Sequence, residues 1–352
     1  MGIIVFFLIL SILILVHEFG HFIAAKKNGV KVEEFGLGFP PRLFSKKIGE
    51  TIYSINLLPL GGFVKVYGEE YHEKTKNKNR AFVYKKPWQK ALIIISGVIG
   101  NLILAWVLLS FLATQGIQVP TNKVVIEEVQ KNTPAQEAGL KVGDTIKAIK
   151  FENKVIVVKT PEDLITVANN KSGKEMLLSV ENTKGIERFV RLTARKTYPK
   201  NQGPLGIAIN GTELKKYSIF EAPIIGFKFS LKYLILIIAG FGELLKSLFT
   251  FHKPSFEVAG PIGIAQFTGQ ALKIGQGALL EFTAALSLNL AVLNIFPFPA
   301  LDGGRLAFVV YEWITKKQVN KNFERSVNSI GMIILLSFVF IITINDIIRI
   351  FR

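Results

Sequence analysis

Two histidines and one glutamate lie close together in the first apolar stretch of the chain. In His17-Glu18-Phe19-Gly20-His21 the imidazoles are four residues apart, a spacing that brings them to one face of a helix. Two imidazoles on one face can hold a zinc ion, and Glu18 can act as the base toward a water activated by the metal. The alternative is two ordinary helical histidines satisfied by neighbouring groups. Ionisable residues are costly in an apolar span and usually mark a site, so the pattern favours metal chemistry.

A catalytic zinc site normally has three protein ligands and one open position, so a third ligand is needed. The sequence has no cysteine, which excludes disulfides and leaves His, Asp or Glu as ligands. The acidic residues in or beside apolar stretches are Glu243, Glu281, Asp302, Glu312 and Asp346. Asp302 is favoured because Pro297 and Pro299 interrupt the helix before it and two glycines follow it, which gives an irregular backbone. Asp302 could also cap a helix that begins at Gly303.

Peptide hydrolysis is the natural reaction of such a centre. The metal would polarise the scissile carbonyl and lower the pKa of the water, and Glu18 would pass the proton to the leaving amine. A peptide bond inside a transmembrane helix is protected by its own hydrogen bonds, so the enzyme must hold its substrate extended. Asn294 could donate a hydrogen bond to the substrate backbone or to the developing oxyanion, or it could only bridge two helices.

The composition indicates a membrane protein. The mean hydropathy is positive and 49% of the residues are hydrophobic. Four stretches approach the roughly 20 apolar residues that cross a bilayer; they are Gly2 to Ala25, Ala91 to Ala113, Ala284 to Leu301 and Ile330 to Ile350. A fifth, Ala222 to Leu248, carries several charges. We expect it to lie on the outer surface or to brace the bundle, because a fifth crossing would bring Asp302 to the wrong side.

The basic residues indicate how the chain is oriented. The net charge is +17, but Lys and Arg are spread over loops between apolar spans, which argues against nucleic acid as a partner. They are frequent between Lys26 and Lys90 and again before the last span, so both loops should be cytoplasmic. The first span has no basic residues before it, which favours a retained span with its N-terminus outside over a signal peptide.

Two further parts complete the predicted architecture. Thr51 to Leu57 and Phe63 to Tyr67 are short alternating runs separated by Pro59-Leu60-Gly61-Gly62, which predicts a β-hairpin next to the membrane. The edge of this hairpin, around Gly61, Gly62, Phe63 and Val64, could pair with an unwound substrate. From about Val119 to Lys196 the chain turns soluble, with short β-like runs and a capped helical turn at Thr133-Pro134-Ala135-Gln136.

The predicted fold class is therefore a multi-span α-helical membrane protein with four transmembrane helices, a membrane-associated β-hairpin and one inserted α+β domain. Residues 1–118 form the N-terminal membrane part with the HExxH span. Residues 119–197 form the inserted domain, and residues 198–283 a linker with a membrane-surface helical segment. Residues 284–352 form the C-terminal membrane part.

These motifs together resemble the bacterial site-2-type intramembrane zinc metalloproteases, the RseP-like group. The resemblance rests on HEFGH, PLGGFVKVYGE, PAQEAGLKVGD in a PDZ-like insert, GPIGIAQ and NIFPFPALDGG, in that order over nearly the whole chain. It implies that His17, His21 and Asp302 bind zinc and that Glu18 is the base. It also implies that Gly61 to Gly68 clamps substrate, with Asn294 assisting. Two departures stand away from these ligands: the second span lacks the family's Gly-Pro, and Gly38-Phe39-Pro40-Pro41 lacks its glycine.

The resemblance also implies a location and a role. It places the chain in the bacterial cytoplasmic (inner) membrane, in contact with membrane lipid and with the PDZ-like domain extracytoplasmic. The substrates would be single-span membrane proteins whose ectodomain has been removed, such as anti-sigma factors, and leftover signal peptides.

Two other functions stay open. One is a membrane metalloprotease that processes soluble or lipidated termini, which would usually take its third ligand from a downstream Glu. The other is a PDZ-bearing membrane zinc-binding scaffold or carrier, which would have no use for the base Glu18.

Overall fold

The computed structural model describes residues 2–69, 77–151, 154–199, 202–250 and 258–350. The chain divides into two compact units. One is made of residues 1–115 and 217–352, and the other, the insert domain, of residues 116–216. Residues 77–86, ahead of the second apolar stretch, contain two short 3₁₀ turns, Lys78–Arg80 and Phe82–Tyr84.

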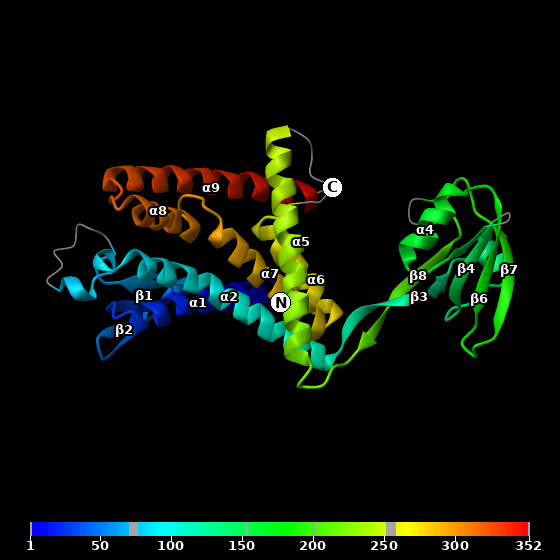
Figure 1. Ribbon diagram of the computed structural model, residues 1–352, viewed down its shortest axis with the longest axis horizontal. Coiled ribbons are helices and arrows are strands. Elements are labelled where there is room, and N and C mark those ends of the chain that lie inside the picture. The colour runs from blue at the N-terminus through cyan, green and yellow to red at the C-terminus, as the bar shows by residue number, and fades with distance from the viewer. Residues whose placement is uncertain (1, 70–76, 152–153, 200–201, 251–257, 351–352) are drawn as a thin grey trace. The chain divides into compact units, whose positions relative to one another are not determined.

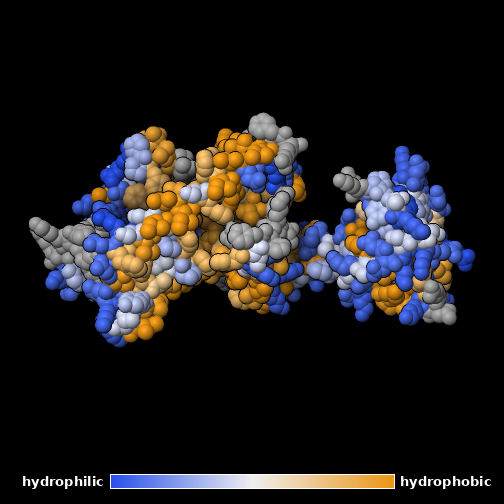
Figure 2. Space-filling model, turned by 90° about the horizontal axis from the view of Figure 1, so that it is seen from above, coloured by the Kyte–Doolittle hydropathy of each residue, from blue (hydrophilic) through white to orange (hydrophobic). Residues whose placement is uncertain are grey.

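The first unit is built mainly from helices. They are α1 (Gly2–Lys27), α2 (Pro87–Gln115), α5 (Ala222–Thr250), α6 (Pro261–Ile274), α7 (Gln276–Ile295), α8 (Asp302–Thr315) and α9 (Lys321–Ile350). Five helices of the described chain, α1, α2, α5, α7 and α9, are long and apolar enough to cross a membrane. Figure 2 shows hydrophobic residues over much of the face of this unit, whereas the insert domain is mostly hydrophilic. The first unit is therefore an integral membrane part.

The predicted bounds of two spans are corrected by the structure. The span expected at Ala284 to Leu301 is α7, which begins at Gln276 and ends at Ile295. It ends there because Phe296 adopts an extended conformation ahead of Pro297, and a residue before proline is disfavoured in a helix. The last span begins at Lys321, before the expected Ile330, because the polar first turns of α9 continue the same helix.

Glycines bring α1 and α2 into close antiparallel contact. A Cβ on Gly20 would lie 2.2 Å from the carbonyl oxygen of Ser96, and one on Gly100 would lie 2.8 Å from that of Val16. Small residues at such points let two helix backbones approach closely in a membrane. The histidine-bearing face of α1 is thereby held against α2.

Contacts at the helix ends show which ends lie together. A Cβ on Gly2, at the start of α1, would lie 3.0 Å from Gly269 Cα in α6. The backbone N–H of Gly263 in α6 donates a hydrogen bond of 2.8 Å to the buried carboxylate of Asp346, near the end of α9. The start of α1, the end of α9 and helix α6 therefore share one end of the bundle.

Helix α5 starts at this end and runs across the bundle. The backbone N–H of Tyr217, just before α5, donates to the carbonyl of Ala113 in the last turn of α2. Figure 1 shows α5 crosswise to α1, α2 and α9. Farther along, Phe241 packs edge-on against Phe296 at the end of α7, with ring centroids 4.9 Å apart.

The β-structure of the membrane part differs from the predicted hairpin. Strand β1 (Val32–Ile48) pairs with strand β2 (Thr51–Val66), and the turn between them is at Gly49-Glu50. The predicted hairpin of two runs around Pro59 to Gly62 is therefore wrong. The run of Thr51 to Leu57 pairs with one side of the segment Glu34–Leu37, and the run of Phe63 to Tyr67 pairs with its other side. The two runs are therefore separated by that segment, and Pro59 to Gly62 connect them.

The insert domain is an antiparallel sheet with two short helices. Its elements are β3 (Ile117–Val129), α3 (Pro134–Glu137), β4 (Thr145–Phe151), β5 (Lys154–Val157), α4 (Pro161–Asn170), β6 (Glu175–Glu181), β7 (Glu187–Thr193) and β8 (Ile207–Lys215), with strand order β7-β6-β4-β3-β8 and β5 beside β4. The capped turn is confirmed, since the side chain of Thr133 accepts a hydrogen bond from the backbone of Gln136. The expected end at residue 197 is wrong, because β8 pairs with the first strand of the domain.

Candidate metal centre

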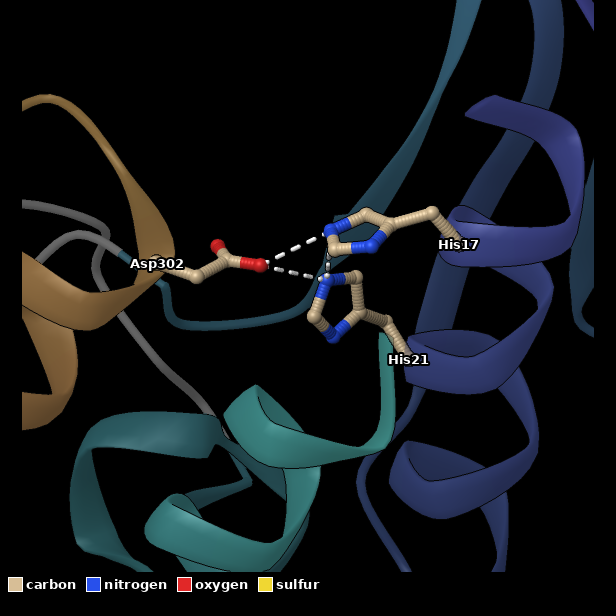
Figure 3. A group of neighbouring side chains, drawn as sticks. All are labelled: His17, His21 and Asp302. Carbon is tan, nitrogen blue, oxygen red and sulfur yellow. Dashed lines mark hydrogen bonds and ion pairs between the residues drawn. The ribbon is translucent and has the colours of Figure 1, made fainter. Parts of the chain in front are cut away.

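Three side chains from two distant parts of the chain meet in the membrane part. His17 Nε2 lies 2.9 Å and His21 Nε2 3.0 Å from the same carboxylate oxygen, Oδ2 of Asp302, and the two ring nitrogens lie 3.1 Å apart. Figure 3 shows both imidazoles pointing from α1 toward the carboxylate. Among the described residues this is the group of three that could hold a metal ion. The predicted ligands are thus brought together.

The backbone before α8 explains how Asp302 arrives there. The chain leaves α7 through the proline-rich segment and turns at Ala300, whose φ is +73°. Gly303 and Gly304 allow the first turn of α8 to pack directly against this segment. A Cβ on Gly303 would lie 2.1 Å from the carbonyl oxygen of Phe296, and one on Gly304 would lie 2.4 Å from that of Phe298. Leu301, not Asp302, occupies the N-cap position, so the capping role is wrong and the carboxylate is left for the site.

The donor set fits zinc. Two imidazole nitrogens and one carboxylate oxygen leave a tetrahedral ion one open position, as catalytic zinc sites require. Donors held about 2 Å from a tetrahedral ion lie roughly 3.3 Å apart, close to the spacing observed here. Gly97 on α2 keeps the space beside the rings free, since a Cβ there would lie 2.5 Å from His21 Nε2 and 2.7 Å from His17 Cε1. Larger residues at this position would fill the metal site.

The nitrogens that face away from the centre also meet polar groups. His21 Nδ1 lies 2.8 Å from the carbonyl oxygen of Ile93, which accepts a hydrogen bond from Nδ1–H and leaves Nε2 free for a metal. His17 Nδ1 lies 3.5 Å from the amide of Asn101 on α2.

Asn294, the predicted substrate-binding residue on α7, places its amide nitrogen 3.5 Å from His17 Nε2. It therefore lies beside the metal position.

Glu18 lines a cavity of about 90 Å³ next to the ligands. The cavity is also lined by His21 and Asp302, by Val64 and Val66 of β2, and by Arg305 of α8. A Cβ on Gly62 would lie 3.7 Å from Cγ of Glu18, so the predicted base is in contact range of the strand. The base, two ligands and the strand thus line one cavity.

The segment Gly62–Val66 is an edge of the sheet. Its residues pair with Val32–Leu37 on one side, and the described part of the chain places no strand on the other. An edge of this kind presents unpaired N–H and C=O groups to an added strand. Of the predicted substrate-binding residues, Val64 lines the cavity and Gly62 lies near the side chain of Glu18. Phe63 packs against Gly36, and Gly61 lies near Ile14 of α1.

The other acids considered as ligands have different partners. Glu281 accepts a hydrogen bond from Tyr233, and Glu312 forms an ion pair of 3.0 Å with Lys90. Asp346 is bound to α6, as described above. Glu243 lies on α5 and is not a member of the cluster. Asp302 is thus the acid that completes the centre.

Sequence reasoning missed four residues of this region. Gly97 and Asn101 come from α2, which carries no ligand, and their only signal was a small and a polar residue four positions apart in an apolar span. The expectation that the departure in the second span stands away from the ligands is therefore wrong, because both residues lie beside the histidines. Arg305 lies one turn after Asp302 and forms an ion pair with Glu69, which follows the end of β2. This pair ties the strand beside Glu18 to the helix that carries Asp302.

Comparisons with known proteins identify relatives over nearly the whole chain. The model of the family described as peptidase family M50 matches residues 5–338. The chain is 36% identical over 349 residues to "Putative zinc metalloprotease CA_C1796" of Clostridium acetobutylicum, covering 99% of this chain and 97% of the relative. It is 35% identical over 341 residues to "Putative zinc metalloprotease CPE1693" of Clostridium perfringens, covering 96% of each. It is 30% identical over 434 residues to "Putative zinc metalloprotease SA1105" of Staphylococcus aureus, covering 99% and 98%.

Proposed function

Because the chain belongs to peptidase family M50, the zinc metallopeptidases of site-2 type, we propose that it cuts peptide bonds inside transmembrane segments of other proteins. The observation that carries the proposal is the position of the metal centre. His17 and His21 lie inside α1, a helix of 26 residues that is long and apolar enough to cross a membrane. A substrate must therefore bring its scissile bond into the apolar layer to reach them.

The geometry supports a separate role for each residue of the centre. His17, His21 and Asp302 hold zinc, which supplies a Lewis acid and lowers the pKa of water when it is bound. Glu18 takes the water proton on its carboxylate and returns it to the leaving amine. Asn294 beside His17 directs its N–H toward the substrate carbonyl, where negative charge develops.

The edge Gly62–Val66 holds the substrate in extended form. Main-chain pairing to this edge replaces the internal hydrogen bonds that an unwound helix loses, so the substrate backbone keeps its partners within the membrane. The ion pair between Glu69 and Arg305 fixes the end of this strand to α8. The substrate strand is thereby set at a defined distance from Asp302.

Four crossings account best for the helix ends. Helix α5 begins at the end of the bundle where α2 stops. The next helix, α6, packs against the first residues of α1 and the last turn of α9 at that same end. An even number of crossings follows, with α5 bracing the bundle instead of spanning it. Protease-accessible tags at Tyr217 and Lys273 should both appear outside, and tags on opposite sides would overturn the four-span arrangement.

The setting follows from the same orientation. The basic loop between α1 and α2 favours the cytoplasmic side, which leaves the insert domain, a PDZ-like module, outside a bacterial cytoplasmic membrane. Substrates are single-span proteins after removal of their ectodomain, with anti-sigma factors and leftover signal peptides as the class to try first. The small cavity of about 90 Å³ supports a preference for a slender, unwound chain.

Cleavage of a tagged single-span substrate by the purified full-length protein tests the proposal. The wild type should cut the substrate. Glu18→Gln should keep zinc and lose cleavage, and Asp302→Asn should lose both. Cleavage by Glu18→Gln at the rate of the wild type would move the hydrolytic site elsewhere and leave these residues with the role of a zinc carrier or scaffold.

A further inference from the structure

We propose that Asn101 on α2 is a positioning residue for the metal centre. Its side-chain oxygen accepts a hydrogen bond from Nδ1–H of His17 and so holds this imidazole in the tautomer that offers Nε2 to zinc. The inference concerns the zinc site alone and is independent of which substrate is cut.

The burial of Asn101 makes its hydrogen bonds costly to leave unmade. Asn101 faces α1 and α7 from α2 and is fully buried, with 0% of its surface exposed. Its amide nitrogen lies 3.5 Å from Nδ1 of His17, and its amide oxygen is buried with no hydrogen-bond partner. A polar atom left unpaired in the interior costs about 1–3 kcal/mol. An asparagine in an apolar span is thus not explained by packing.

The needs of the metal decide how the amide is oriented. Zinc binds the lone pair of Nε2, so the proton of neutral His17 sits on Nδ1. With the amide nitrogen facing Nδ1, two donors would oppose each other. A half-turn of the amide, which exchanges its oxygen and nitrogen, turns this repulsion into a hydrogen bond from Nδ1–H to Oδ1. The NH₂ group then takes the position in which the amide oxygen has no hydrogen-bond partner.

The second ligand shows the same arrangement. His21 Nδ1 lies 2.8 Å from the carbonyl oxygen of Ile93, also on α2. Zinc-binding histidines nearly always donate their second N–H to an oxygen in this way. Helix α2 therefore contributes no ligand but orients both imidazoles, one through a backbone carbonyl and one through Asn101.

The position of Asn101 is itself fixed from the third helix. The hydroxyl of Ser287 on α7 donates a hydrogen bond of 2.8 Å to the backbone carbonyl of Asn101, and Ser287 is fully buried. Gly100, next in the chain, packs against the backbone of α1. The amide is thus held at a constant distance from His17.

Two substitutions at Asn101 separate its acceptor from its size. Asn101→Asp keeps an oxygen in either orientation and should bind zinc within a few fold of the wild type. Asn101→Leu keeps the volume without an acceptor and should bind zinc about 10–100-fold more weakly, the usual effect of losing a group that orients a ligand. Zinc affinity is measured on the full-length protein in detergent by competition with a chelator. Thr283→Val on α7 is the matched control, because the buried hydroxyl of Thr283 donates only within its own helix, to the carbonyl of Leu279, and this variant should bind zinc like the wild type.

The outcomes are distinct even where a variant folds poorly. The melting temperature of each zinc-free protein reports folding separately from metal binding. Wild-type zinc affinity in a folded Asn101→Leu would overturn the proposal. So would an Asn101→Asp variant that folds and loses as much affinity as Asn101→Leu, because the amide nitrogen would then be the important group. If Asn101→Leu does not fold, Asn101→Ala replaces it and should show the same loss of zinc affinity, and wild-type affinity in that variant would overturn the proposal.

Discussion

Substitution of Gly97 by alanine should remove zinc without harming the helix that carries it. A Cβ on Gly97 would lie 2.5 Å from Nε2 and 2.6 Å from Cε1 of His21, and 2.7 Å from Cε1 of His17. The added methyl group would therefore meet both ligand rings on the side where the metal binds. Alanine favours a helix over glycine by up to about 1 kcal/mol, so α2 itself gains.

The size of the effect follows from these distances. Non-bonded carbon and nitrogen atoms settle about 3.5 Å apart, so each ring must retreat by roughly 1 Å. The ligands of a metal site must stay within about 0.5 Å of their binding positions. Loss of an orienting group alone weakens zinc binding by about 10–100-fold, and displaced ligands should cost at least the upper value. A 100-fold loss corresponds to about 2.7 kcal/mol.

The assay is zinc content after dialysis and zinc affinity by chelator competition, with melting of the zinc-free protein as the control for folding. Gly242→Ala on α5 is the matched variant, because a Cβ there would meet nothing within 4 Å. It should bind zinc like the wild type. Zinc affinity of Gly97→Ala equal to that of Gly242→Ala would refute the placement of the metal between these rings.

Other perturbations test the surroundings of the centre. Glu69→Gln and Arg305→Gln break the ion pair between β2 and α8; each should lower kcat/KM for a single-span substrate several-fold with zinc content unchanged, and loss of zinc together with activity would contradict the role given to the strand. Lys90→Met should lower stability by about 3 kcal/mol, the lower end of the range for a broken buried pair, because it leaves the largely buried carboxylate of Glu312 unpaired between α2 and α8. The double variant Lys90→Met/Glu312→Leu should recover most of this loss in thermal melts, and failure to recover would show that the charge itself is not the cause.

The centre could be predicted from the sequence because its signals are chemical and local. The His17 to His21 spacing fixes two ligands on one helical face whatever surrounds them. Asp302 stood out from four other acids through the prolines and glycines around it, and the structure confirms that these create the turn that brings it in. Asn101 gave no such signal, since its role depends on which side of α2 faces His17.

The sheet could not be predicted for a physical reason. Pairing in β1 and β2 is decided by contacts between strand segments far apart in the sequence, and Glu34–Leu37 is paired from both sides. The run of Thr51 to Leu57 and the run of Phe63 to Tyr67 alternate in the same way whether they pair with each other or with a third segment. Strand β8 was missed for the same reason, because it pairs with β3 at the other end of the insert.

The most direct test of intramembrane cleavage is the identity of the bond that is cut. A single-span substrate is incubated with the full-length protein in liposomes, the products are weighed by mass spectrometry, and the Glu18→Gln variant gives the blank. We predict new termini that lie within the apolar span and are missing from the blank. Cuts confined to the soluble flanks of the span would contradict the assignment of the centre to bonds inside the membrane.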